Sequence, residues 1–108
     1  MIEVIPYNSM WPILFKEESN RICSLLNEEV LAIHHIGSTA VPGLKAKPII
    51  DIVVVVKNRS EAMPYFETLG YKFKGEYNIP LRDYYNKEGF HLHVYEKDHP
   101  EKIGRAHV

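Results

Sequence analysis

Apolar and polar positions follow two different periods along this chain. Apolar side chains recur every three or four positions over residues 11–27, which predicts an amphipathic helix with Asn8 or Ser9 as its cap. The same period over residues 61–69 predicts a shorter helix that is capped by Ser60. Both helices present one apolar face, so each is expected to pack against another element.

Patterns with a period of two predict the strands. Residues 2–5 and 30–36 are typical of short strands, and residues 71–77 alternate aromatic with charged side chains, as in a half-exposed strand. Residues 82–86 and 90–96 are separated by Lys-Glu-Gly, which predicts a β-hairpin.

The longest apolar run, IIDIVVVV, covers residues 49–56 and is interrupted only by Asp51. A β-branched run of this kind predicts a central strand that is covered on both faces. The order of elements is helix, strand, loop, strand, helix and then strands. This order predicts an α+β domain with a small mixed or antiparallel sheet and flanking helices.

Composition and charge exclude some classes of function. The net charge of −1 gives no general attraction to nucleic acid or to an anionic membrane, so any basic site must be local. The apolar run is far too short to cross a bilayer, and the N-terminus lacks the pattern of a signal peptide. The single cysteine, Cys23, excludes an internal disulfide and fits a reducing compartment. These features predict a cytoplasmic protein without a membrane partner.

Small and basic residues gather in the loop that precedes the long apolar strand. Gly37 permits a positive φ and a close approach of the backbone, while Ser38 and Thr39 offer hydroxyl groups. Lys45 and Lys47 add local positive charge. Such a loop can hold a phosphate group, although Gly-Ser-Thr is also typical of an ordinary turn.

Asp51 and a His-Leu-His sequence are the residues best suited to chemistry. An unpaired carboxylate inside an apolar strand is costly, so Asp51 must be paired, hydrogen-bonded, bound to a metal or placed at the exposed end of the strand. His91 and His93 are two positions apart on one predicted strand and therefore point to the same face. If that strand neighbours the Asp51 strand, the three side chains can hold a divalent metal or pair an acid with a general base. The alternative is one structural histidine and one surface histidine.

Three further residues are candidates for the same site. Arg82 can clamp a phosphate with two hydrogen bonds, or it can be an ordinary surface arginine. His34 and His35 point to opposite faces of a strand, so at most one of them belongs to the site. We expect it to be His35, which has the same alternation as Gly37.

The sequence from His35 to Ile52, HIGSTAVPGLKAKPIIDI, closely resembles the signature of the GrpB family. The resemblance extends to Leu-Gly-Tyr at residues 69–71 and to His-Leu-His-Val at residues 91–94. It implies a nucleotidyltransferase-like domain over residues 1–101, of a kind found in bacteria both alone and fused to dephospho-coenzyme A kinase.

In proteins of that superfamily a Gly-Ser turn holds nucleotide phosphates, and two acids spaced i, i+2 bind divalent metal ions for nucleotidyl transfer. The resemblance therefore implies that the turn at residues 37–38 contacts phosphate and that Asp51 is the first acid, with Mg²⁺ or Mn²⁺ as the cofactor. Val53 occupies the position of the second acid and cannot bind Mg²⁺. His93 or Glu76 is the candidate substitute.

The sequence is compatible with both an enzyme and a binding module. The leading hypothesis is binding of a nucleotide or another phosphorylated small molecule, with metal-dependent nucleotidyl transfer. The alternative is a non-catalytic binding module, accessory to nucleotide or coenzyme A metabolism, and Val53 favours it. A third hypothesis is an inactive fragment. Under the leading hypothesis the catalytic residues are Asp51 and His93, the phosphate-binding residues are Gly37, Ser38, Thr39, Lys47 and Arg82, and the metal ligands are Asp51, His91 and His93.

The last residues carry a separate expectation. The sequence IGRAHV, at residues 103–108, is what one reading frame of a common sequencing adapter encodes. Residues 102–108 are therefore predicted to be a non-native tail, and the natural domain to continue past Glu101 and to be truncated here. A genuine short polar tail is the alternative.

Overall fold

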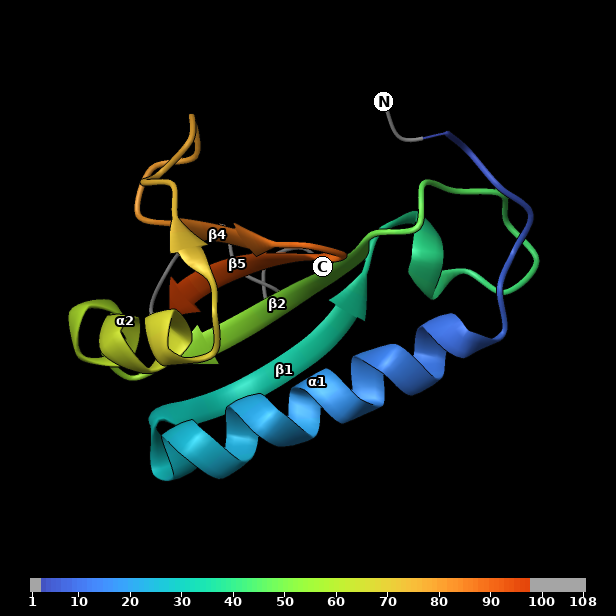
Figure 1. Cartoon of the computed structure of the whole chain (residues 1–108). Coiled ribbons are helices and arrows are strands. Elements are labelled where there is room, and N and C mark those ends of the chain that lie inside the picture. Colours follow the sequence, from blue (N-terminus) through green and yellow to red (C-terminus); the bar gives the residue numbers. More distant parts are fainter. Residues whose placement is uncertain (1–2, 98–108) are drawn as a thin grey trace.

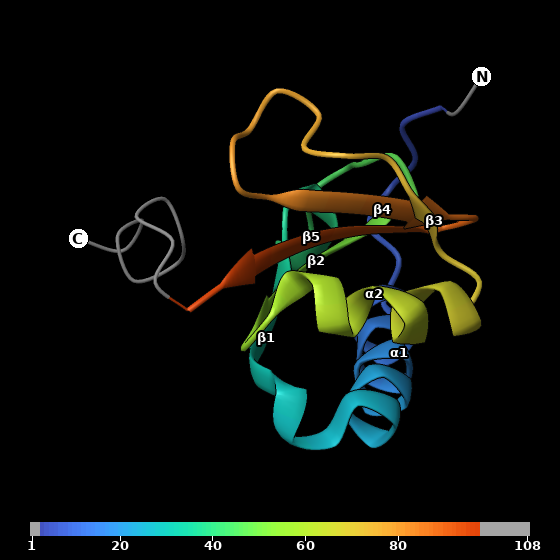
Figure 2. The same cartoon turned by 90° about the vertical axis from the view of Figure 1, so that its left-hand side faces the viewer.

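The computed structural model describes residues 3–97, which form two α-helices on one face of a five-stranded sheet (Figures 1 and 2). The predicted tail at residues 102–108 lies outside the described residues. No helix among residues 3–97 is long and apolar enough to cross a membrane. The elements are α1 (Met10–Leu26), η1 (Asn27–Glu29), β1 (Val30–Ile36), η2 (Ser38–Ala40), β2 (Ile50–Val56), α2 (Arg59–Thr68), β3 (Lys72–Phe73), β4 (Asp83–Lys87) and β5 (Phe90–Glu96).

The sheet is mixed, with the strand order β1-β2-β5-β4-β3. β2 and β5 run parallel to each other, and the other neighbouring pairs are antiparallel. The predicted α+β architecture is therefore confirmed. β4 and β5 form the predicted hairpin, in which Lys87 pairs with Phe90.

The core lies between the helices and the sheet face that they cover. Alternate residues of β2 and β5 point toward α1 and α2, and their apolar side chains remove the helix faces from water. Val53 and Val55 point to the opposite face of β2 and are also buried, with 6% and 5% of their surface exposed. The prediction that this strand is covered on both faces is thus confirmed. The core side chains include Trp11, Ile22, Leu26, Ile50, Ile52, Val54, Val56, Phe66, Tyr85, Leu92 and Val94.

The start of α2 differs from the prediction, because Asn58 and not Ser60 is the cap. Asn58 has the extended backbone of a cap, and its Oδ1 accepts a hydrogen bond from the backbone N–H of Glu61 at 2.9 Å. Ser60 lies inside the helix and donates its hydroxyl to the same Oδ1 at 2.7 Å. At the start of α1, Oδ1 of Asn8 accepts from the backbone N–H of Met10 at 2.8 Å.

Two of the predicted strands are shorter than expected. The strand at residues 71–77 is reduced to β3, because Gly75, Tyr77 and Asn78 have positive φ angles of 77°, 50° and 71° that turn the chain away from the sheet. Of the strand predicted at residues 2–5, the described part contributes one antiparallel bridge, from Ile5 to Ala46.

Glu18 is a charged residue on the inner side of α1, and its surface is 0% exposed. Its Oε2 accepts hydrogen bonds from the Tyr71 hydroxyl at 2.6 Å and from Nζ of Lys87 at 2.8 Å, and Arg21 contacts Oε1 at 2.8 Å. Burial alone would raise the pKa of Glu18, but the bonds from Lys87 and Tyr71 outweigh it and lower the pKa. Burial and the bond to Glu18 raise the pKa of Tyr71. These contacts fasten α1 to β4 and to the segment that follows α2.

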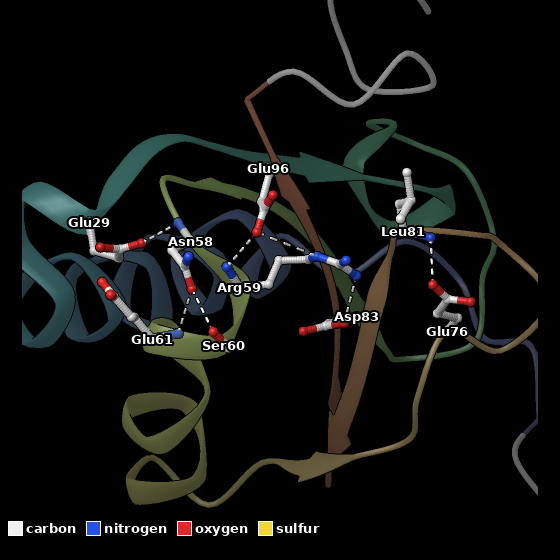
Figure 3. A network of polar contacts seen from close by, with 9 residues as sticks. All are labelled: Glu29, Asn58, Arg59, Ser60, Glu61, Glu76, Leu81, Asp83 and Glu96. Atoms are coloured by element: carbon white, nitrogen blue, oxygen red, sulfur yellow. Dashed lines mark hydrogen bonds and ion pairs between the residues drawn. The ribbon is translucent and has the colours of Figure 1, made fainter.

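A second polar network ties the start of α2 to the sheet (Figure 3). Nη1 of Arg59 donates to Oδ1 of Asp83 at 2.9 Å, and the backbone N–H of Arg59 donates to Oε2 of Glu96 at 2.9 Å. Glu29 accepts from the backbone N–H of Asn58 at 2.6 Å. Burial raises the pKa of Asp83, although the Arg59 charge acts against it. The network holds the sheet end where β2 and β5 finish, while Asp51 lies at the other end.

Candidate functional site

Asp51 lies near the start of β2, where β1 ends and β5 begins. In the antiparallel pair Ile36 is opposite Asp51, and in the parallel pair His91 is opposite Asp51. The chain leaves β1 through Gly37, so the Gly-Ser loop begins beside the carboxylate. The neighbouring strands that the His-Leu-His hypothesis required are therefore present.

Gly37 is in close contact with the Asp51 side chain. A Cβ atom at this position would lie 2.9 Å from Oδ2 of Asp51 and 3.4 Å from its Cβ. The backbone of Gly37 has φ 77° and ψ −170°, a conformation that only glycine adopts without strain. Glycine is thus needed here both for the turn and for the position of the carboxylate.

The Asp51 carboxylate contacts both histidines of β5. Its Oδ1 lies 3.2 Å from Nε2 of His93 and 3.5 Å from Nδ1 of His91. The side chains of Asp51, His91 and His93 are 29%, 32% and 18% exposed. Asp51 is therefore paired within the fold and remains reachable from solvent, as a ligand-binding group requires.

A hollow of about 410 Å³ opens next to these residues. Its size is within the range of small-molecule sites, about 300–1,000 Å³. Loop residues and strand residues share the lining, so the hollow joins the two parts that the sequence singled out. The polar lining residues are Ser38, Thr39, Lys45, Lys47, Asp51 and His91.

Thr39 and His35 support the loop from the helix side. The Thr39 hydroxyl donates to the carbonyl oxygen of Ile49 at 3.0 Å and accepts from Nε2 of His35, also at 3.0 Å. The His35 ring stacks on Phe15 of α1 with 4.9 Å between ring centroids. His35 does not line the hollow, so the expectation that it belongs to the site is corrected. His35 pairs with the core residue Ile52, so its side chain lies on the sheet face that α1 covers. Asp51 pairs with Ile36 and points to the other face.

The position of His35 predicts a pH dependence of stability. Burial lowers the pKa of His35, and the nearby Asp51 charge opposes this only in part. A base whose pKa is lower in the folded chain than in the unfolded one destabilises the fold as the pH falls below about 6.5. His35→Gln should therefore show a smaller decrease in unfolding free energy between pH 7 and pH 5, measured by urea unfolding. His34→Gln removes an exposed imidazole as the control, and equal pH dependence in the two variants would contradict the prediction.

Arg82 is buried, with 5% of its surface exposed, and does not line the hollow. Its Nη1 donates to Nδ1 of His93 at 3.0 Å, and its Nη2 donates to the carbonyl oxygens of Glu76 and Tyr77 at 3.0 and 2.9 Å. Its Nε is buried without a hydrogen-bond partner among the described residues, and Arg82 does not line the hollow. The structure therefore gives no support to the expected phosphate clamp. Glu76 accepts from the backbone N–H of Leu81 at 2.8 Å and belongs to the loop at residues 74–82.

Tyr84 is a neighbour of the histidines that the sequence reasoning missed. Its ring centroid lies 5.5 Å from those of His91 and His93, and the Arg82 guanidinium lies 5.1 Å above it. The predicted hairpin could have revealed this neighbour, because its tight turn before Phe90 places Tyr84 opposite His93. Tyr84 therefore packs against both histidines and against the Arg82 guanidinium.

The described residues do not fit the metal pair that the family resemblance implies. Val53, at the position of the second acid, is buried and has no ligand atom. The Asp51 carboxylate directs Oδ1 at the imidazoles of His91 and His93. Among residues 3–97 no group of three or more His, Cys, Asp or Glu side chains is arranged to hold a metal ion. Mg²⁺ and Mn²⁺ prefer several oxygen ligands. We therefore derive no step through a metal.

Comparison with known proteins identifies the relatives of the chain. The family model described as GrpB protein matches residues 1–107. The protein YqkA of Bacillus subtilis is 40% identical over 106 residues, which cover 92% of this chain and 31% of YqkA. A dephospho-CoA kinase of Mycolicibacterium paratuberculosis is 31% identical over 71 residues, 63% of this chain and 17% of the kinase.

A solved structure agrees with these relatives. The crystal structure of conserved protein GrpB from Enterococcus faecalis superposes with a TM-score of 0.83 at 36% identity, covering 92% of this chain and 64% of that one. The chain spans from about a third to about a half of the curated GrpB relatives that it matches. The family model and the shared fold lead to the same conclusion: this chain belongs to the GrpB family.

Proposed function

We propose that this chain binds a phosphorylated small molecule in the hollow between the loop at residues 37–47 and the start of β2. One observation carries the proposal: Ser38, Lys45 and Lys47 of the loop line the same hollow as Asp51 and His91. A Lys ammonium group and a Ser hydroxyl are common partners of phosphate oxygens.

Charge in the hollow also favours an anionic ligand. Lys45 and Lys47 are exposed and carry two positive charges at the rim, whereas the Asp51 carboxylate is directed toward His93 and His91. The chain as a whole has a net charge of −1, so this local excess does not follow from composition. The phosphate therefore binds at the lysine side, away from Asp51.

Binding without nucleotidyl transfer is the function that we favour. Transfer by the two-metal route needs a second acid beside Asp51, and Val53 stands there. A nucleotide remains a suitable ligand, because its phosphates match the lysines. The similarity to a dephospho-CoA kinase supports a role as a module accessory to nucleotide or coenzyme A metabolism.

The proposal is tested by calorimetric titration of the whole chain with pyrophosphate and with ATP, each with and without Mg²⁺. The double variant Lys45→Met/Lys47→Met should bind pyrophosphate at least about tenfold more weakly, because two charge-assisted contacts are lost. Mg²⁺ should not strengthen binding, since no metal pair is formed and chelation by Mg²⁺ lowers the negative charge of the ligand.

The control is the double variant Lys16→Met/Lys57→Met, which makes the same charge change at two exposed lysines outside the hollow. It should keep the affinity of the parent apart from a small long-range effect. Equal loss in both double variants, or no pyrophosphate binding by the parent, would refute the phosphate site. Binding that requires Mg²⁺ and is lost in Asp51→Asn would favour the metal-dependent alternative.

A further inference from the structure

The two histidines beside Asp51 have different hydrogen-bonding states. A carboxylate accepts hydrogen bonds and donates none, so a neutral imidazole turns an N–H toward it. For His93 the nitrogen nearest to Asp51 is Nε2, at 3.2 Å, and for His91 it is Nδ1, at 3.5 Å. Whether each ring can bind a ligand therefore depends on its other nitrogen, the one that does not face Asp51.

His93 has no nitrogen left for a ligand. Its Nδ1 lies 3.0 Å from Nη1 of Arg82, and a guanidinium group only donates hydrogen bonds. Nδ1 is therefore the acceptor and Nε2 carries the proton that points at Asp51. Arg82 is itself held by the carbonyl oxygens of Glu76 and Tyr77, so this tautomer is fixed from a buried position.

His91 keeps one nitrogen free. With the proton on Nδ1, facing Asp51, the lone pair is on Nε2, and no partner for Nε2 is found in the described part of the chain. The ring lines both the hollow with the lysines and a neighbouring one that includes Lys72 and Asn86. Burial lowers the pKa of His91, more than the Asp51 charge raises it, which keeps the ring neutral and the lone pair available.

We infer that Nε2 of His91 is the hydrogen-bond acceptor of this site and that the ligand is a phosphate ester with a hydroxyl group near its phosphate. This inference rests on the phosphate site proposed above. The phosphate lies on Lys45 and Lys47, and the hydroxyl donates to Nε2. The hydroxyl keeps its proton, and Asp51, which faces Nδ1 of His91, favours the tautomer whose lone pair is on Nε2. His93 is a positioning residue that holds Asp51 with the help of Arg82.

Nitrogen-15 NMR of the imidazole rings in the whole chain tests the tautomers without any ligand. His93 should carry its proton on Nε2 and His91 on Nδ1. Arg82→Met should release Nδ1 of His93 and change its tautomer ratio, whereas Arg21→Met, at an exposed arginine, should not. A proton on Nε2 of His91, or a His93 tautomer insensitive to Arg82→Met, would overturn the assignment.

Two probes that differ only in hydroxyl groups test the ligand class. Glycerol 3-phosphate should bind at least about fivefold more tightly than n-propyl phosphate, measured by shifts of ring and backbone resonances. His91→Phe should abolish this preference while both esters still bind, and His91→Leu, which also lacks an acceptor, serves as a second variant should the first not fold. Binding of both esters without preference would refute the hydroxyl contact but leave the phosphate site standing. Binding of neither would refute the phosphate site itself and with it the ligand class.

Discussion

Gly37→Ala is expected to lose the geometry around Asp51 and to destabilise the chain by about 1–3 kcal/mol. The backbone of Gly37, with φ 77° and ψ −170°, is strained for any residue with a Cβ. The added methyl group would lie 2.9 Å from Oδ2 of Asp51, so the carboxylate must turn away and lose its contacts with His93 and His91. Chemical denaturation measures the loss of stability. The histidine tautomers measure the loss of the geometry around Asp51.

Gly43→Ala is the matched control for this experiment. Gly43 has a similar φ of 82°, lies in the same loop and would place its Cβ with nothing within 4 Å. It should therefore cost some stability through backbone strain and leave the ring nitrogen resonances of His91 and His93 unchanged. If Gly37→Ala changed stability alone, as Gly43→Ala does, the proposed dependence of Asp51 on glycine would be wrong.

Glu18→Gln is expected to destabilise the chain by about 2–4 kcal/mol. Removing one partner of a buried ion pair leaves the other charge uncompensated, which costs about 3–5 kcal/mol when both are fully buried. The Lys87 side chain is 23% exposed, so part of this cost is recovered by water. The midpoint of thermal unfolding should fall by more than about 10 °C.

Glu17→Gln makes the same chemical change at the neighbouring exposed position of α1 and should stay within about 0.5 kcal/mol of the parent. The depressed pKa of Glu18 adds a second readout. Its contribution to stability is present above the pKa of the unfolded chain, about 4.3, and is lost as the pH falls through the folded value. Glu18→Gln should therefore lose less stability on acidification than Glu17→Gln. Equal losses at neutral pH in the two variants would contradict the buried role of Glu18.

Local patterns were sufficient for most of the elements. The amphipathic helix at residues 11–27 corresponds to α1, and the strands predicted at residues 30–36 and 90–96 have the bounds of β1 and β5. Each of these signals depends on side chains within one or two turns of chain, so no distant partner was needed. The strand predicted at residues 71–77 is shorter in the structure because positive φ angles at Gly75, Tyr77 and Asn78 end the extended backbone, and the alternation of side chains does not encode these angles.

The sequence identified most residues of the candidate site but not how they lie relative to one another. The parallel pairing of β2 with β5 brings His91 and His93 to Asp51 across about forty residues of chain, and the sequence offered this only as a condition. Strand order in a sheet is decided by which faces bury together, and that is a property of the whole chain.

The sequence by itself determined that a small-residue loop with two lysines precedes a strand with one carboxylate, Asp51. It also showed that valine, at position 53, stands where a second carboxylate would be needed. Only the tertiary structure decided which polar groups are free. It placed His35 under α1, buried Arg82 against His93, and left His91 facing the hollow. The reason is that a side chain's chemistry depends on its hydrogen-bond partners and its exposure. Both come from residues distant in sequence, which no local period encodes.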